Sequence, residues 1–83
     1  MAWYQREDYP RIRDMMADAG RLAATYDSWL VSAEQVASEV ERSGIAVERV
    51  LLRPEEFADW CVARSLTRDG AARSRFANEA AQR

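Results

Sequence analysis

One short segment places a cysteine, an arginine and three carboxylates within ten residues. This segment, "EEFADWCVAR" (residues 55–64), holds the single cysteine, Cys61, with Arg64 three residues later. An arginine one helical turn away favours the thiolate, which is the reactive form of cysteine. Helical spacing also places Cys61 between Phe57 and Trp60 on an apolar face, where a free cysteine behaves as a small hydrophobe. We therefore predict that Cys61 belongs to the core and that Arg64 covers the Trp60 ring.

The three carboxylates are better explained by helix structure than by catalysis. Glu55 and Glu56 follow Pro54 in the first turn of an expected helix, where acidic residues are favoured. Asp59 has no evident acid–base partner, and the chain contains neither histidine nor lysine. Ser-His and Cys-His pairs, imidazole zinc ligands, Schiff bases and a P-loop lysine are therefore excluded. We predict a protein that is not an enzyme and has no catalytic, cofactor-binding or metal-binding residues.

The arginine-rich end of the chain is the second candidate. Residues 64–83 contain five arginines and two acidic residues, an asymmetry that can mark a nucleic-acid surface. The whole chain nevertheless has a net charge of −2, and Arg75 stands four residues before Glu79, as in an exposed helical ion pair. We therefore expect a solvated helix face and keep nucleic-acid binding as the alternative. The candidate nucleic-acid contacts are Arg68, Arg73 and Arg75.

These residues need a scaffold, and the apolar pattern predicts a mainly α (α+β) fold in the order helix-helix-strand-helix-helix. The chain forms one small globular domain, residues 1–83, in which residues 1–8 are the most loosely held. The segment boundaries follow from capping residues and prolines. The expected N-caps are Thr25 and Asp69, Pro54 opens the third helix, and Gly20 and Gly44 end the first and second helices.

The segment "IAVERVLL", residues 45–52, is rich in β-branched residues and is predicted to form the strand. Its apolar residues point to both faces, which is typical of a strand covered on both sides. It pairs with residues 2–6, or with the same strand of a second molecule, or it is merely extended. We favour self-pairing in a dimer, together with an exposed part of the second or third helix. The candidate interface residues are Val47, Arg49, Val50, Leu51 and Leu52.

Several spaced motifs resemble small uncharacterised bacterial proteins of about this length. These proteins share a "YxxWxxxAE" helix, a "VxRV" strand, a "PxxFxxWC" helix and an "ARxxFA" tail. The resemblance implies no activity. The matching residues are Tyr26, Trp29, Ala33, Glu34, Val47, Arg49, Val50, Pro54, Phe57, Trp60, Cys61, Ala72, Arg73, Phe76 and Ala77.

Composition indicates where such a protein works. One cysteine forms no internal disulfide, and no secretory segment or membrane-spanning apolar run is present, so we expect a cytoplasmic protein without a membrane partner. Arginine supplies every basic residue and alanine occurs fifteen times, as in GC-rich bacterial genomes. We predict a bacterial protein–protein interaction or adaptor module that forms a homodimer or binds an unknown protein partner.

Overall fold

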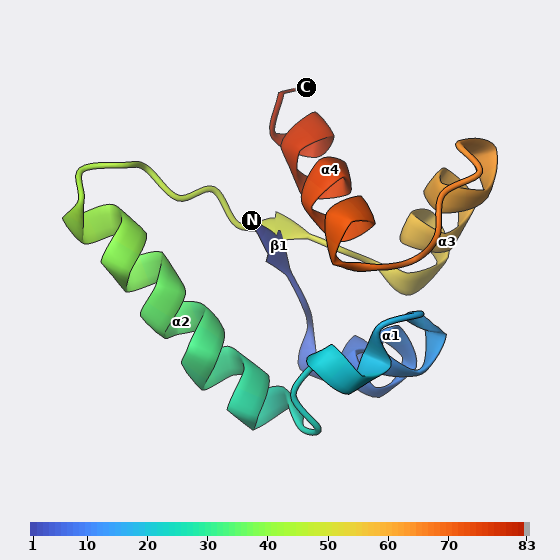
Figure 1. Cartoon of the computed structure of the whole chain (residues 1–83). Coiled ribbons are helices and arrows are strands. Elements are labelled where there is room, and N and C mark those ends of the chain that lie inside the picture. Colours follow the sequence, from blue (N-terminus) through green and yellow to red (C-terminus); the bar gives the residue numbers. More distant parts are fainter. Residues whose placement is uncertain (83) are drawn as a thin grey trace.

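The computed structural model describes residues 1–82, which fold around a two-stranded sheet (Figure 1). Helix α2 stands on one side of the sheet, and α3 and α4 stand on the other. The predicted order of four helices and a strand is confirmed, and Arg83 of the basic tail lies outside the described residues. The elements are β1 (Ala2–Trp3), the 3-10 helix η1 (Arg6–Asp8), α1 (Tyr9–Met15), the 3-10 helix η2 (Ala19–Arg21), α2 (Tyr26–Arg42), β2 (Val50–Leu51), α3 (Pro54–Ala63) and α4 (Gly70–Ala81).

The predicted strand pairs with the first residues of the same chain. β1 and β2 are parallel, with Ala2 beside Val50 and Trp3 beside Leu51. The Val50 amide donates to the Met1 carbonyl at 2.9 Å, and the Leu52 amide donates to the Trp3 carbonyl at 2.8 Å. The strand therefore has a partner within the chain, which was the alternative to self-pairing. Within residues 1–8, expected to be the most loosely held, Ala2–Trp3 form β1 and Arg6–Asp8 form η1.

The strand is shorter than predicted and is covered on one side. Of the predicted residues 45–52, only Val50–Leu51 is regular strand. Leu52 is fully buried and Val50 partly buried, but the Leu51 side chain on the other face is 40% exposed. The prediction of cover on both faces is therefore wrong. The sheet is only two strands wide, and α4 packs on it, so its other face is left partly open to solvent.

The segment that leads from α2 back to β2 is held by Arg49. Its guanidinium lies 3.5 Å from the Glu34 carboxylate and 3.7 Å from that of Glu41, both on α2. The same guanidinium lies 4.8 Å from the centre of the Trp3 ring. Arg49 thus joins one flank of α2 to β1, while Val47 beside it is partly buried. Both residues, predicted at an interface between molecules, make contacts within this one.

The capping residues act as predicted. The Thr25 hydroxyl accepts from the Ser28 amide at 3.2 Å, and the Asp69 carboxylate accepts from the Ala72 amide at 3.0 Å. Gly44 has a φ of 89°, and its amide donates to the Glu41 carbonyl at 3.0 Å. This arrangement is a Schellman motif, in which glycine adopts the left-handed conformation at low cost. Local sequence therefore determines both ends of α2.

α1 ends at Met15 rather than near Gly20, where the sequence predicted its end. The Ala17 amide donates to the Arg68 carbonyl at 2.7 Å, and the Arg68 Nε donates to the Met15 carbonyl at 2.7 Å. These bonds replace the next helical hydrogen bonds. Because Arg68 lies more than fifty residues away, no local pattern indicates this end.

The core contains two groups of aromatic rings, and α2 contributes little to it beyond its first turns. One group joins β1, α1 and the start of α2, and the other joins α3 and α4. Further along α2, the fully buried residues are Ala33 and Ala37, so the helix projects as an arm (Figure 1). The first group contains Trp3, Tyr4, Tyr9, Tyr26 and Trp29, and the second contains Phe57, Trp60 and Phe76.

Candidate functional site

Cys61 lies in the core, as predicted. Its side chain is buried in the cluster that contains Phe57, Trp60 and Phe76. Burial raises the pKa of the Cys61 thiol, so the thiolate is disfavoured at neutral pH. The Arg64 guanidinium lies 4.6 Å from the centre of the Trp60 ring, which confirms that Arg64 covers this ring. This segment is therefore a packing element.

Arg73, one of the candidate nucleic-acid contacts, is bound within the molecule. Its Nη1 and Nη2 donate to the two carboxylate oxygens of Asp18 at 2.7 and 3.0 Å. The Arg73 side chain is 11% exposed and that of Asp18 18% exposed. The Gly70 amide also donates to Asp18, at 3.1 Å. These bonds, led by that from Arg73, lower the pKa of Asp18 and join the loop after α1 to the start of α4.

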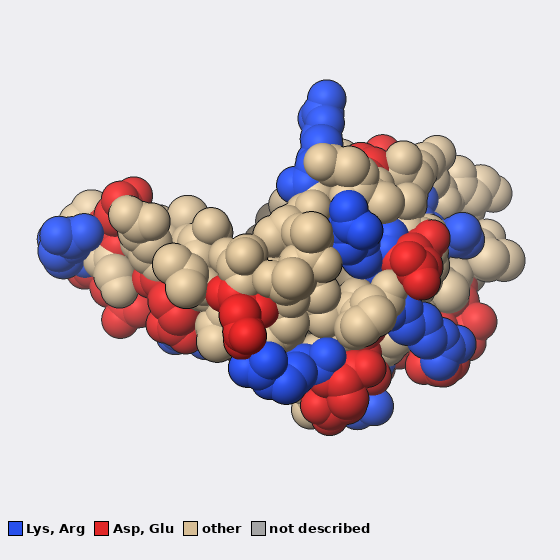
Figure 2. Space-filling model, turned by 90° about the horizontal axis from the view of Figure 1, so that it is seen from below, with Lys and Arg blue, Asp and Glu red and all other residues tan. Residues whose placement is uncertain are grey.

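The other two candidate arginines do not combine with Arg73 into one free surface. Arg75 lies 3.1 Å from Glu79, the predicted pair at i,i+4, and Arg68 donates to the Met15 carbonyl. In the face drawn in Figure 2, acidic and basic side chains alternate and form no single basic area. The structure thus leaves Arg68 and Arg75, both exposed, as the remaining candidates for contact with a nucleic acid.

One flank of α2 is an apolar surface. Helical geometry places Trp29, Val36 and Val40 along this flank, opposite the flank on which Glu34 and Glu41 bind Arg49. Val36 is 50% exposed, while Trp29 and Val40 are partly buried. The apolar repeat of this helix does not reveal that the arm is only partly covered. We call Trp29, Val36 and Val40 the open flank.

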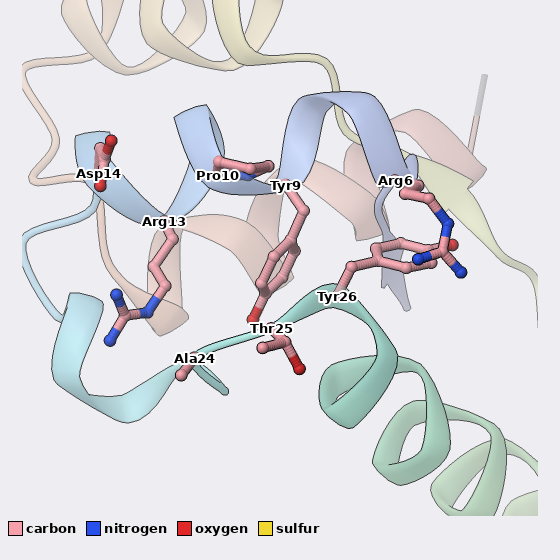
Figure 3. A pocket seen from close by; sticks show the side chains of 8 residues that line it. All are labelled: Arg6, Tyr9, Pro10, Arg13, Asp14, Ala24, Thr25 and Tyr26. Carbon is pink, nitrogen blue, oxygen red and sulfur yellow. The ribbon is translucent and has the colours of Figure 1, made fainter.

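A hollow of about 370 Å³ lies between α1 and the start of α2 (Figure 3). The Tyr9 ring stands in its centre, and the Tyr9 hydroxyl donates to the Ala23 carbonyl at 2.6 Å. Burial raises the pKa of Tyr9, so its hydroxyl stays protonated. No pattern in the sequence indicates this hollow, which needs α1 to end early. Its lining residues are Arg6, Tyr9, Pro10, Arg13, Asp14, Ala24, Thr25 and Tyr26.

The two arginines of this hollow differ in their partners. Arg6 lies 2.7 Å from the Asp27 carboxylate and 4.7 Å from the centre of the Tyr26 ring. Arg13 forms no ion pair with any of residues 1–82, and its Nε is buried without a hydrogen-bond partner. No partner within residues 1–82 therefore accounts for the partly buried position of the Arg13 guanidinium.

Comparison with known proteins places nearly the whole chain in one family. The family described as "Domain of unknown function (DUF8829)" matches residues 4–83. The chain belongs to the DUF8829 family. The match includes the open flank, the hollow between α1 and α2 and all of the aromatic core except Trp3. No curated protein and no solved structure matches the chain.

Across residues 1–82, no helix combines the length and apolar character needed to cross a membrane. The same residues bring together no group of three or more His, Cys, Asp or Glu side chains that could hold a metal ion.

Proposed function

We propose that the chain is a bacterial, cytoplasmic protein–protein interaction module that forms a homodimer through the open flank of α2. The observation that carries the proposal is the incomplete cover of this helix. α2 is the longest helix, with 17 residues, yet Val36 in the middle of its apolar stripe is half exposed. An apolar stripe on a projecting helix is stabilised when a second helix covers it.

The lack of charge on the open flank favours a second copy as the partner. A two-fold interface uses the same surface of both copies, so charges of one sign on that surface would repel one another. The three residues of the open flank are uncharged, Ser32 lies beside them and Glu39 lies at the outer edge, while Glu34 and Glu41 lie on the opposite flank. Along the middle of the arm in Figure 2, charged side chains follow one edge and uncharged ones the other. The flank is therefore self-compatible.

The length of α2 limits the area of this contact and therefore the strength of the association. A helix of 17 residues is about 25 Å long, so two antiparallel copies share a contact of a few turns. Such a contact is at the small end of specific interfaces, and we expect a dissociation constant of about 1 μM or weaker. Trp29, partly buried and adjacent to Trp3, is the natural anchor because tryptophan is enriched among residues that dominate interfaces.

The test compares two substitutions on the same helix. Val36→Glu places a charge on the open flank, whereas Val31→Glu introduces the same group on the side of α2 that faces away from the body. Val31 is 69% exposed, so it is a matched control. Sedimentation equilibrium should show dimers for the unchanged chain and for Val31→Glu, and a dimer weakened about tenfold or more for Val36→Glu. A strictly monomeric unchanged chain at high concentration, or equal effects of both variants, would contradict the proposal.

The non-enzymatic part of the proposal is supported by composition. The chain has no histidine or lysine, and its single cysteine is buried with a raised pKa. These features remove the groups that most enzymes use as bases, nucleophiles and metal ligands. The bacterial and cytoplasmic assignments are supported by the arginine- and alanine-rich composition and by the single free thiol.

Nucleic-acid binding remains the alternative, with two of the three candidate arginines left to make the contacts. Arg73 is held by Asp18, so its replacement would disturb folding rather than binding. If a duplex binds, Arg68 and Arg75 should make the contacts, and affinity should fall steeply with added salt. Absence of duplex binding at low salt would remove this alternative.

A further inference from the structure

Arg13 differs from every other arginine of residues 1–82 in its combination of burial and missing partner. Ten of the eleven arginines in this range are either exposed to solvent or, for Arg73, bound by Asp18. Arg13 is partly buried on α1, yet it has neither an ion pair nor a hydrogen bond to its buried Nε. Desolvating a guanidinium without a partner costs free energy, since the lost hydration is not replaced.

The nearby carboxylates do not fill this role. Asp27 is bound by Arg6, which lies at the other end of the hollow in Figure 3. Asp14 precedes the end of α1, and Figure 3 shows its carboxylate on the side of the helix away from the Arg13 guanidinium. There Asp14 also lines a second hollow, with Met15, Met16 and Arg68 among its neighbours. The side of the hollow at Arg13 is therefore positively charged and unneutralised.

We propose that the hollow between α1 and α2 binds a small ligand through an oxyanion, a carboxylate or a phosphate, that pairs with Arg13. A guanidinium holds such groups with two parallel hydrogen bonds, which Arg13 would donate from its two Nη groups. Two further features favour an anion here. Thr25 caps α2 at the edge of the hollow, and the first amides of this 17-residue helix provide its positive end.

The remaining lining limits the kind of molecule that carries the oxyanion. A hollow of about 370 Å³ has the size of a small-molecule site rather than that of a single ion. The rings of Tyr26 and Pro10 supply apolar surface, which suits a flat or compact hydrophobic body. A monoanion attached to a small ring or a short apolar chain matches this lining. This inference is independent of the proposed dimer, because it rests on α1 and the start of α2 rather than on the open flank.

The experiment follows the Arg13 side chain directly. In two-dimensional NMR of the ¹⁵N-labelled full chain, benzoate and phenyl phosphate are titrated separately, so that the two sources of the oxyanion are distinguished. We expect saturable shifts of the Arg13 Nε–H signal and of the Thr25 and Tyr26 amides with at least one of the two probes. Arg13→Gln should weaken binding about tenfold or more, because the charge-assisted hydrogen bonds are lost.

Matched variants distinguish a specific binding site at Arg13 from general attraction of the anionic probes to any arginine. Arg21→Gln removes an exposed arginine of η2 that also has no ion pair within residues 1–82, and it should leave the titration unchanged. Arg13→Lys keeps the charge but loses the planar fork, so it should bind more weakly than the unchanged chain and more tightly than Arg13→Gln. Shifts that rise linearly without saturation for both probes, or equal losses in the Arg13→Gln and Arg21→Gln variants, would overturn the proposal. Circular dichroism confirms that each variant is folded.

Discussion

At the scale of single residues, Asp18 and Arg73 hold the two halves of the chain together. They are 55 residues apart in sequence, yet they form a two-bond ion pair with little exposure to solvent. Asp69 stands four residues before Arg73, which is the usual spacing of a helical ion pair. Asp69 instead caps α4, and this frees Arg73 to reach the loop after α1. Chemically identical arginines therefore differ in role according to which distant carboxylate they meet.

Replacing Asp18 by Asn should lower stability in a pH-dependent way. The bond from Arg73 lowers the pKa of Asp18 in the folded chain, so its contribution is fully present above the ordinary aspartate pKa of about 3.9. That contribution is lost as the pH falls through the lower folded value. We expect Asp18→Asn to reduce the free energy of unfolding by about 2 kcal/mol at pH 7 and by less below pH 4.

Urea denaturation at neutral and at acidic pH measures this difference. Glu55→Gln is the control, since Glu55 forms its ion pair with Arg11 on the exposed surface. The bonds that lower the pKa of Glu55, its own backbone amide first and Arg11 second, lie in solvent, so the change should be smaller. An Asp18→Asn variant that loses the same stability at both pH values would show that the pair contributes no charge-dependent stabilisation.

At the scale of secondary-structure elements, some boundaries depend on local sequence and others depend on contacts between distant residues. Thr25, Gly44, Pro54 and Asp69 determine helix ends through their own backbone preferences, and the sequence predicted all of these ends. The end of α1 depends on Arg68, and the partner of β2 is at the start of the chain, so neither could be predicted from neighbouring residues. The hollow between α1 and α2 follows from that early end, which explains why the sequence did not reveal it.

The end of α3 provides a prediction about such local signals. Ser65 has a φ of 54°, the left-handed region, and its amide donates to the Val62 carbonyl at 3.2 Å. The Leu66 amide donates to the Cys61 carbonyl at 2.9 Å, which completes a Schellman motif with serine where glycine is preferred. Ser65→Gly should therefore raise the free energy of unfolding by about 0.5–1 kcal/mol, measured in urea. Ser43→Gly is the control, because Ser43 has a φ of −81° and should gain nothing.

At the scale of the whole molecule, the arm formed by α2 is the feature that most needs an explanation. The rest of the chain packs around two groups of aromatic rings, whereas the outer half of α2 rests on Ala37 and the Arg49 ion pairs. Single helices of this length are marginally stable in water, so the stability of the arm depends on what covers its apolar stripe. An interaction module needs a surface of this kind, which is exposed in the single chain and covered in the assembly.

Amide hydrogen exchange tests whether the stability of the arm depends on a second copy, and it does so independently of the molecular mass measured by sedimentation. If a second copy covers the open flank, exchange of the amides from Ala33 to Val40 should slow as the protein concentration rises. At a free concentration about ten times the dissociation constant, the slowing should be about tenfold, because binding stabilises the closed arm by mass action. The amides of α3 and α4, packed around Phe57 and Phe76, should show little change beyond that of global unfolding.

The two valine variants give this measurement its control. Val31→Glu leaves the open flank intact and should keep the concentration dependence, whereas Val36→Glu should exchange rapidly at every concentration. Rapid exchange that does not depend on concentration in the unchanged chain would mean that no second copy covers the arm. Slow exchange that does not depend on protein concentration would mean that the arm is stable in the single chain. Ala33, Ala37 and the ion pairs of Arg49 would then be sufficient to hold it. The concentration dependence of exchange in α2 therefore decides whether this surface serves self-association.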